Sequence, residues 1–89
     1  MTIRIDPHTR SRMPARGISE DEIVEVLRGG VPAPASFGRL SKEKVFRFDS
    51  MWQGRSYSQK KVKVVYVEDD DAMVTVTAYA YYGSWREET

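Results

Sequence analysis

The chain has 89 residues, 40% hydrophobic and 30% charged, a balance typical of a globular protein. We therefore expect a single domain over residues 1–89. The absence of cysteine excludes disulfides, thiolate zinc sites and a cysteine nucleophile. There is no apolar run near the roughly 18 residues needed to cross a bilayer and no signal-peptide core, so we expect a cytoplasmic protein that does not contact membranes.

Charge is distributed unevenly along the chain, although the net charge is only +1. Residues 1–38 are balanced. Residues 39–63 hold eight Lys or Arg and two acidic residues, whereas residues 64–89 hold one Arg and six acidic residues. A basic segment of this kind can attract a polyanion such as RNA. It is also typical of solvated strand edges, where Lys and Arg prevent edge-to-edge aggregation.

The N-terminal part predicts a short strand or ordered arm at residues 2–5, followed by a helix over residues 7–16. Asp6 can cap the free N–H groups of this helix, and Pro7 suits its first position. Pro14 removes one helical hydrogen bond and is expected to kink or shorten the helix, which the glycine after Arg16 ends.

A second helix is predicted to begin after Ser19. Ser19 and Glu22 have the spacing of a capping box. Apolar residues then follow at helical spacing, namely Ile23, Val26 and Leu27. The pair Gly29-Gly30 is expected to end the helix in the left-handed conformation. Residues 31–38 contain two prolines and are expected to form a connection.

The rest of the chain predicts strands at residues 44–48, 61–67 and 72–82, with turns at 51–54 and 68–71. Helices that pack on one face of such strands give a two-layer sandwich. The expected fold class is therefore α+β, with two N-terminal helices packed on an antiparallel sheet of three or four strands.

The first predicted helix carries a candidate catalytic pair. His8 and Arg12 are four residues apart and share one helical face. His8 has the side chain best suited to proton transfer near neutral pH, and Arg12 can hold a phosphate by a bidentate fork. Arg10 and Arg16 lie nearby in sequence. The alternative is a solvent-facing histidine beside surface arginines.

The last predicted strand carries a second candidate site. Strict alternation places Thr75, Thr77, Tyr79 and Tyr81 on one face. These side chains can stack on bases and donate hydrogen bonds to phosphate, or they can simply pack across strands. Trp85 follows and either extends this aromatic surface or covers the small core.

Lys61 and Lys63 lie on the face of their strand opposite to Val62 and Val64. They can stabilise charge that develops on a phosphate, or they can act as edge-strand gatekeepers. We expect no metal or cofactor. The chain has one histidine and no cysteine, and it lacks a phosphate-binding glycine loop and a dinucleotide motif. The acidic turn at residues 69–71 is more typical of a solubilising loop than of a calcium site.

Several segments together resemble a known family. PHTRSRM at 7–13, RGISEDEI at 16–23 and VL at 26–27 resemble the start of the DUF4258 family. KVKVVYV at 61–67 and VTVTAY at 74–79 are similar to its closing strand pair. The resemblance covers most of the chain.

This resemblance implies a fold like that of RelE-type toxins, among small metal-independent endoribonucleases in which the ribose 2′-hydroxyl attacks the adjacent phosphate. Carried over by residue, it implies that His8 is the acid–base group, that Arg12 or Arg16 holds phosphate, and that Thr77 supports it. It also implies an antitoxin protein as a partner.

Two functional hypotheses follow. The first is an RNA-cleaving toxin of a toxin–antitoxin pair, and the second is a non-catalytic RNA- or protein-binding module of the same fold; a homodimer without a nucleic-acid role is a further alternative. The candidate catalytic residues are His8, Arg12 and Thr77. The candidate RNA-binding residues are Arg10, Arg16, Lys61, Lys63, Thr75, Tyr79 and Tyr81.

Overall fold

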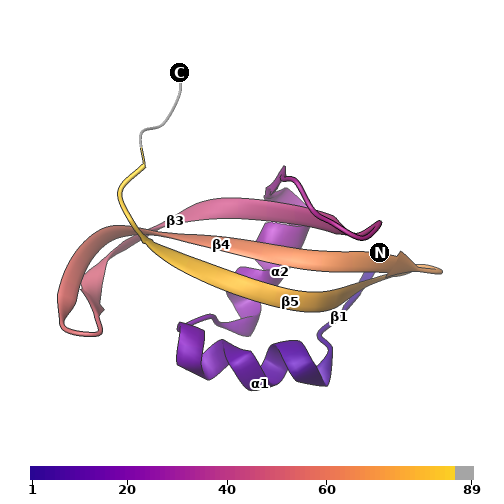
Figure 1. Cartoon of the computed structure of the whole chain (residues 1–89), viewed down its shortest axis with the longest axis horizontal. Helices are drawn as coiled ribbons and strands as arrows, with labels where there is room; N and C mark the ends of the chain where they lie inside the picture. The colour runs from indigo at the N-terminus through magenta and orange to yellow at the C-terminus, as the bar shows by residue number, and fades with distance from the viewer. Residues whose placement is uncertain (86–89) are drawn as a thin grey trace.

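Five strands form one sheet in the order β1-β5-β4-β3-β2 (Figure 1). A computed structural model of the chain describes residues 1–85. Its elements in chain order are β1 (Thr2–Arg4), α1 (Pro7–Arg16), α2 (Glu20–Gly29), β2 (Val31–Pro32), β3 (Leu40–Trp52), β4 (Arg55–Asp69) and β5 (Ala72–Gly83). The three long strands β3, β4 and β5 are antiparallel neighbours and make up most of the sheet.

The expected fold class is wrong in the make-up of the sheet and the place of the helices. β1 precedes both helices and pairs in parallel with β5, so the sheet is mixed and the helices do not begin the fold. β2 adds a fifth strand at the opposite edge by pairing with β3. These two strands have only three and two residues. Segments of two or three residues are too short to show the alternating hydrophobic pattern of a strand. They become strands because they pair with a long neighbouring strand.

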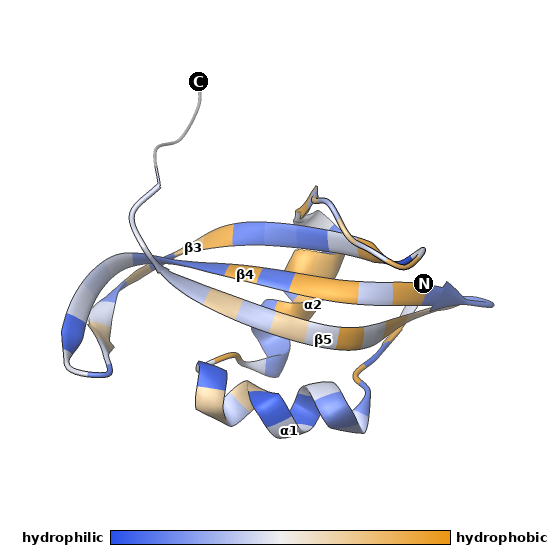
Figure 2. Cartoon of the chain, in the orientation of Figure 1, coloured by the Kyte–Doolittle hydropathy of each residue, from blue (hydrophilic) through white to orange (hydrophobic). Residues whose placement is uncertain are grey.

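Both helices pack against the same face of the sheet, and the core lies between them and the strands. α1 lies along β5, while α2 crosses β3 and β4 (Figure 1). The apolar stripe of α2 is buried against the strands, and its hydrophobic residues stand out in Figure 2. The buried apolar residues are Met13, Ile18, Ile23, Val26, Leu27, Val62, Val64, Tyr66, Met73 and Ala78.

The helix boundaries follow the capping residues predicted from the sequence. The Asp6 side chain accepts a hydrogen bond from the His8 N–H, and α1 runs through Pro14 to Arg16. The capping box of Ser19 and Glu22 is complete in both directions.

The expected left-handed stop of α2 is wrong. Gly30 caps the helix with φ −76°, in the extended region. Glycine is required at position 30 for a steric reason and not for a left-handed conformation. A Cβ there would clash with the carbonyl oxygens of Val26 and Glu43. Glycine at this position therefore allows the end of α2 to approach β3 closely.

A bulge in β5 changes which side chains face the helices. Val65 pairs with Thr77 and Tyr66 pairs with Thr75, so β5 has one extra residue, Val76, between them. An extra residue moves the side chains on one side of it to the opposite face of the sheet. The predicted four-residue stripe is therefore wrong at Thr75, which is buried on the helix side and donates to the Thr9 hydroxyl at 2.9 Å.

Within residues 1–85, no helix has both the length and the apolar character needed to cross a membrane.

Candidate nucleic-acid interface

The face of the sheet opposite the helices, called the open face below, carries basic, hydroxyl and aromatic side chains in register. Lys63 on β4 pairs with Tyr79 on β5, and Lys61 pairs with Tyr81. Tyr79 and Tyr81 are 38% and 49% exposed. Thr77 lies on the same face as both tyrosines, two residues before Tyr79. The open face therefore offers flat aromatic surface beside positive charge, the combination that single-stranded nucleic acid requires.

Arg16 joins this surface from the end of α1. β1 pairs with β5 only as far as Val74, and no strand within residues 1–85 pairs with this edge of β5 beyond that residue. The Arg16 Nη1 donates to the Ala78 carbonyl at 2.7 Å and lies 3.4 Å from the Thr77 hydroxyl oxygen. Its guanidinium carbon is 5.0 Å from the centre of the Tyr79 ring. The guanidinium is thus held in place, and its other N–H groups have no partner among the described residues.

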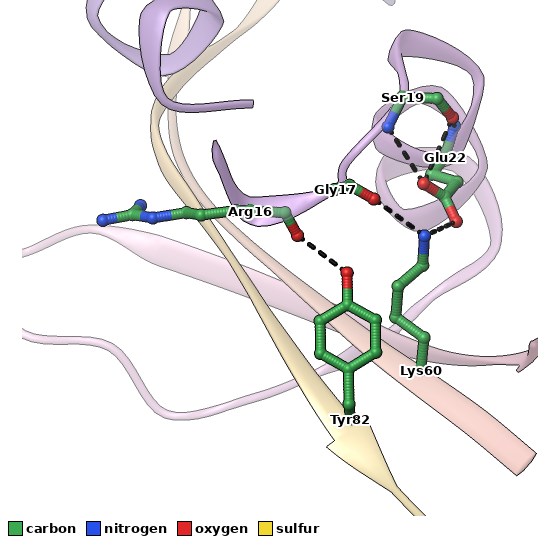
Figure 3. Close-up of polar contacts among 6 residues, drawn as sticks. All are labelled: Arg16, Gly17, Ser19, Glu22, Lys60 and Tyr82. Carbon is green, nitrogen blue, oxygen red and sulfur yellow. Dashed lines mark hydrogen bonds and ion pairs between the residues drawn. The ribbon is translucent and has the colours of Figure 1, made fainter. Parts of the chain in front are cut away.

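An aromatic and polar cluster fixes the backbone from which Arg16 projects (Figure 3). The Tyr82 hydroxyl donates to the Arg16 carbonyl at 2.8 Å. The Trp52 ring stacks on Tyr82 with 4.8 Å between ring centres, so the tip of the β3–β4 hairpin is tied to β5. Burial, and to a smaller extent the nearby Glu22 carboxylate, raises the pKa of Tyr82 above its ordinary value of 10.0. The Arg16 side chain points away from this cluster (Figure 3).

The same cluster contains an ion pair largely withdrawn from water. The Lys60 ammonium lies 2.6 Å from the Glu22 carboxylate, with side-chain exposures of 7% and 19%. Lys60 also donates to the Gly17 carbonyl at 2.9 Å. Glu22 accepts in addition from the Ser19 N–H at 2.9 Å. Lys60 therefore connects β4 to the junction between α1 and α2, which includes the residue after Arg16.

A loop over residues 33–39 covers one end of the open face. The buried Ser41 side chain donates to the carbonyls of Ala33 at 2.8 Å and Pro34 at 3.2 Å, which attaches the loop to β3. Below the loop lies a hollow of about 260 Å³. It is lined by Pro34, Ala35, Ser36, Phe37, Arg39, Lys63, Val65, Thr77 and Tyr79. This lining contains two cations, two aromatic rings and no carboxylate.

Trp85 lies at the other end of the open face. Its ring centre is 4.7 Å from the Lys61 ammonium, and its backbone N–H donates to the Gln59 side-chain oxygen. Trp85 therefore extends the aromatic surface and does not cover the core on the helix side, which was the alternative. The predicted orientation of Lys61 and Lys63 away from the core valines is confirmed by the pairing of β4.

The structure brings some of the predicted site residues together and separates others. Arg16, Thr77 and Tyr79 are in contact at the edge of β5, beside Lys63. Thr75 is 2% exposed and ties the start of α1 to β5 through the Asp6 N–H and the Thr9 hydroxyl, so a ligand on the open face does not reach it.

The predicted catalytic pair lies at a different place from Thr77. His8 and Arg12 are exposed on α1, and Arg10 forms an exposed ion pair with Glu20 at 3.3 Å. His8 is the second residue of α1 and Arg16 is its last, a separation of about 12 Å at 1.5 Å per residue. No hydrogen bond joins the His8 side chain to Thr77 among the described residues.

Sequence reasoning missed the residues of the covering loop, Phe37 and Arg39, and the pairing of Lys60 with Glu22. The last two are 38 positions apart in the chain, and only folding reveals their contact. The sequence around Phe37 does indicate a turn, because Phe37 precedes a glycine in a segment with two prolines. Among the described residues, no group of three or more His, Cys, Asp or Glu is placed to hold a metal ion.

The chain matches the model of a protein family described as "Domain of unknown function (DUF4258)" over residues 5–80. Neither the curated proteins nor the solved structures compared with the chain gave a match. The matched segment includes both helices and the residues Arg16, Lys63 and Tyr79. It confirms the resemblance to this family, while the relation to RelE-type toxins stays a prediction.

Proposed function

The chain belongs to the DUF4258 family, and we propose that it is an RNA-binding domain whose open face holds single-stranded RNA. The observation that carries this proposal is the arrangement at the β5 edge. The Arg16 guanidinium is fixed against the Tyr79 ring and the Ala78 carbonyl, next to Lys63. A positioned guanidinium beside an exposed aromatic ring can hold a phosphate while the ring stacks on a base.

The charges of the open face support a polyanion as the ligand. Arg39 and Lys63 both line the hollow below the loop. Neither of them forms an ion pair with a residue in the range 1–85. Glu43 lies opposite Lys63 on β3 and reduces the local positive charge without neutralising the whole row. The acidic β4–β5 turn lies at the same end of the sheet as the loop, with Asp69 four residues beyond Val65, so it lowers the positive potential there, and a ligand is expected to extend from the hollow toward Lys61.

The hydroxyl groups at the site support RNA in particular. Ser36 and Thr77 line the same hollow as the two cations. Each hydroxyl can donate or accept, which suits the ribose 2′-hydroxyl and phosphate oxygens. The 2′-hydroxyl is the group that distinguishes RNA from DNA at such a site.

We expect the affinity for a fluorescent 12-nucleotide single-stranded RNA to fall with salt. With about three phosphate contacts, from Arg16, Arg39 and Lys63, log K should decrease with log salt with a slope of about −2. Lys63→Gln should weaken binding at low salt and reduce the slope by about 0.7, because one contact is lost. Fluorescence anisotropy titrations over a salt series measure both quantities.

Arg28→Gln is the matched control, because it removes the same charge from an exposed residue at the end of α2. It should leave the slope within error of the parent. A slope that does not change in Lys63→Gln, or changes equally in both variants, would contradict binding at the open face. A complex that does not respond to salt would contradict RNA as the ligand.

RNA cleavage is the second function to be tested, because Arg16 and Thr77 lie together as the resemblance predicts for phosphate contacts. Transesterification also needs an acid–base group within hydrogen-bond reach of the phosphate, and His8 lies about 12 Å along α1 from Arg16. We therefore expect RNA to stay intact during long incubation and His8→Ala to bind it as the parent does. Gel analysis of end-labelled RNA measures this.

Cleavage that His8→Ala abolishes would instead support the endoribonuclease, and with it a toxin that an antitoxin neutralises. Induced expression in a bacterial host tests the same point in cells. The binding function predicts that growth and total RNA remain normal at high soluble expression, whereas a toxin arrests growth.

A further inference from the structure

The tip of the covering loop is a tight turn that carries an unusual residue. The Arg39 N–H donates to the Ser36 carbonyl at 3.2 Å, which closes a four-residue turn. Its two central residues, Phe37 and Gly38, have φ values of 59° and 70°. Positive φ at both central positions is the pattern of a type I′ turn, where the first position favours Asn, Asp or Gly. A phenylalanine there is sterically disfavoured.

The fold gains no packing from this phenylalanine. Phe37 is 92% exposed, so its ring is almost entirely in water. The loop is attached to the sheet through Ser41 and the carbonyls of Ala33 and Pro34, without the Phe37 side chain. The residue therefore combines an unfavourable backbone conformation with an unfavourable exposed ring. Such local conflicts concentrate at functional sites, where the ligand provides the missing contact.

The surroundings of Phe37 identify the chemistry of that ligand. Phe37 and Tyr79 both line the hollow of about 260 Å³, and the Phe37 ring is free to meet a base that enters it. Arg39, the residue that closes the turn, lines the hollow with Lys63, and Ser36 and Thr77 add hydroxyl groups. A flat ring, flanking cations and hydroxyl donors match one nucleotide of a single strand, with its base against the aromatic rings and its phosphate near the cations.

We infer that Phe37 is a base-stacking residue, and that the hollow below the loop takes one unpaired nucleobase of the bound RNA. This inference rests on the proposed RNA-binding function and adds a base-recognition position to it. The exposed Phe37 ring is then in contact with another ring only when RNA is bound. An aromatic ring at position 37 contributes affinity for bases and none for a bare phosphate chain.

Substitutions at this position separate the two contributions. Phe37→Asn suits the left-handed turn and should raise the melting temperature by about 4 °C or more. The same variant should weaken binding of a 12-nucleotide oligouridylate about tenfold. Phe37→Leu should also lose affinity, because it is apolar without a flat ring, whereas Phe37→Trp should retain it. Inorganic polyphosphate, a polyanion without bases, should bind all four proteins equally.

Each outcome of this series leads to one conclusion. Loss of RNA affinity in Phe37→Asn and Phe37→Leu, retention in Phe37→Trp and unchanged polyphosphate binding support the inference. Equal RNA affinity in all four proteins overturns the inference and leaves the proposed function standing. Equal loss for RNA and polyphosphate also overturns it, because the residue would then act on the loop and not on a base. Absence of RNA binding by the parent at low salt overturns the proposed function itself.

Photo-crosslinking provides a readout that does not depend on a variant. RNA containing 4-thiouridine should crosslink to the tryptic peptide of residues 29–39, which trypsin releases by cutting after Arg28 and Arg39. Adducts confined to other peptides would contradict a base at Phe37.

Discussion

Glu22→Gln should lower the free energy of unfolding by about 3 kcal/mol, because it leaves the Lys60 ammonium without its counter-charge in a site where that side chain is 7% exposed. Glutamine has nearly the same shape and retains the acceptor for the Ser19 N–H, so the helix cap is preserved. For a domain of this size the melting temperature should fall by about 12 °C or more. Urea unfolding followed by circular dichroism measures the loss.

The exposed pair of Lys44 and Glu25 is the matched control for this prediction. These side chains lie 3.2 Å apart but are 41% and 57% exposed, so Glu25→Gln should cost less than about 0.5 kcal/mol. The double variant with Lys60→Met and Glu22→Gln should regain part of the stability, since it no longer buries an unpaired charge. A loss in Glu22→Gln no greater than in Glu25→Gln would show that the Lys60 charge remains solvated.

Gly17→Ala should cost about 3 kcal/mol through two separate effects. Gly17 has φ 67°, and a residue with a Cβ is strained there by roughly 1–2 kcal/mol. The added Cβ would also lie 2.5 Å from the Tyr82 hydroxyl and 2.7 Å from the Trp52 ring, and such overpacking adds roughly 1–3 kcal/mol. Because Tyr82 holds the Arg16 carbonyl, the variant should also weaken RNA binding under conditions where it is still folded.

Gly54→Ala isolates the backbone part of this effect. Gly54 has φ 82°, and nothing lies within 4 Å of where its Cβ would be. Its substitution should therefore cost about 1 kcal/mol, from strain alone. The difference between the two variants, measured by urea unfolding, gives the packing contribution at Gly17. Equal costs would mean that the rings of Trp52 and Tyr82 move aside, and that this contact does not hold the junction between the helices.

The sequence predicted the elements whose causes are local. The capping box of Ser19 and Glu22 places the start of α2, because each residue satisfies a backbone group within one turn of its own position. The long alternating strands around residues 61–67 and 72–82 were found because their residues face the core at every second position. The family was also recognisable from the sequence, since the match covers the same helix and strand segments.

Features that depend on distant neighbours were not predictable in this way. β2 is a strand only because β3 offers it an unpaired edge, and the segment at 2–5, expected as a strand or an arm, becomes β1 by pairing with β5. The bulge at Val76 cannot be recognised from the sequence, because residues 74–81 alternate without interruption. The bulge nevertheless places the Thr75 side chain in the core and the Thr77 side chain on the open face.

The candidate site likewise has a part that was predictable from local sequence and a part that depends on tertiary contacts. The sequence by itself determined that Tyr79, Tyr81, Lys61 and Lys63 would share strand faces away from the core valines, because alternation along a strand is local geometry. Only the tertiary structure decided that Arg16, and not His8, meets Thr77, and that Phe37 and Tyr79 line one hollow. The residues of these two pairs are 61 and 42 positions apart in the chain. Their geometry depends on how α1 and the covering loop pack against the sheet. This packing cannot be predicted from the spacing of residues within a single helix or strand.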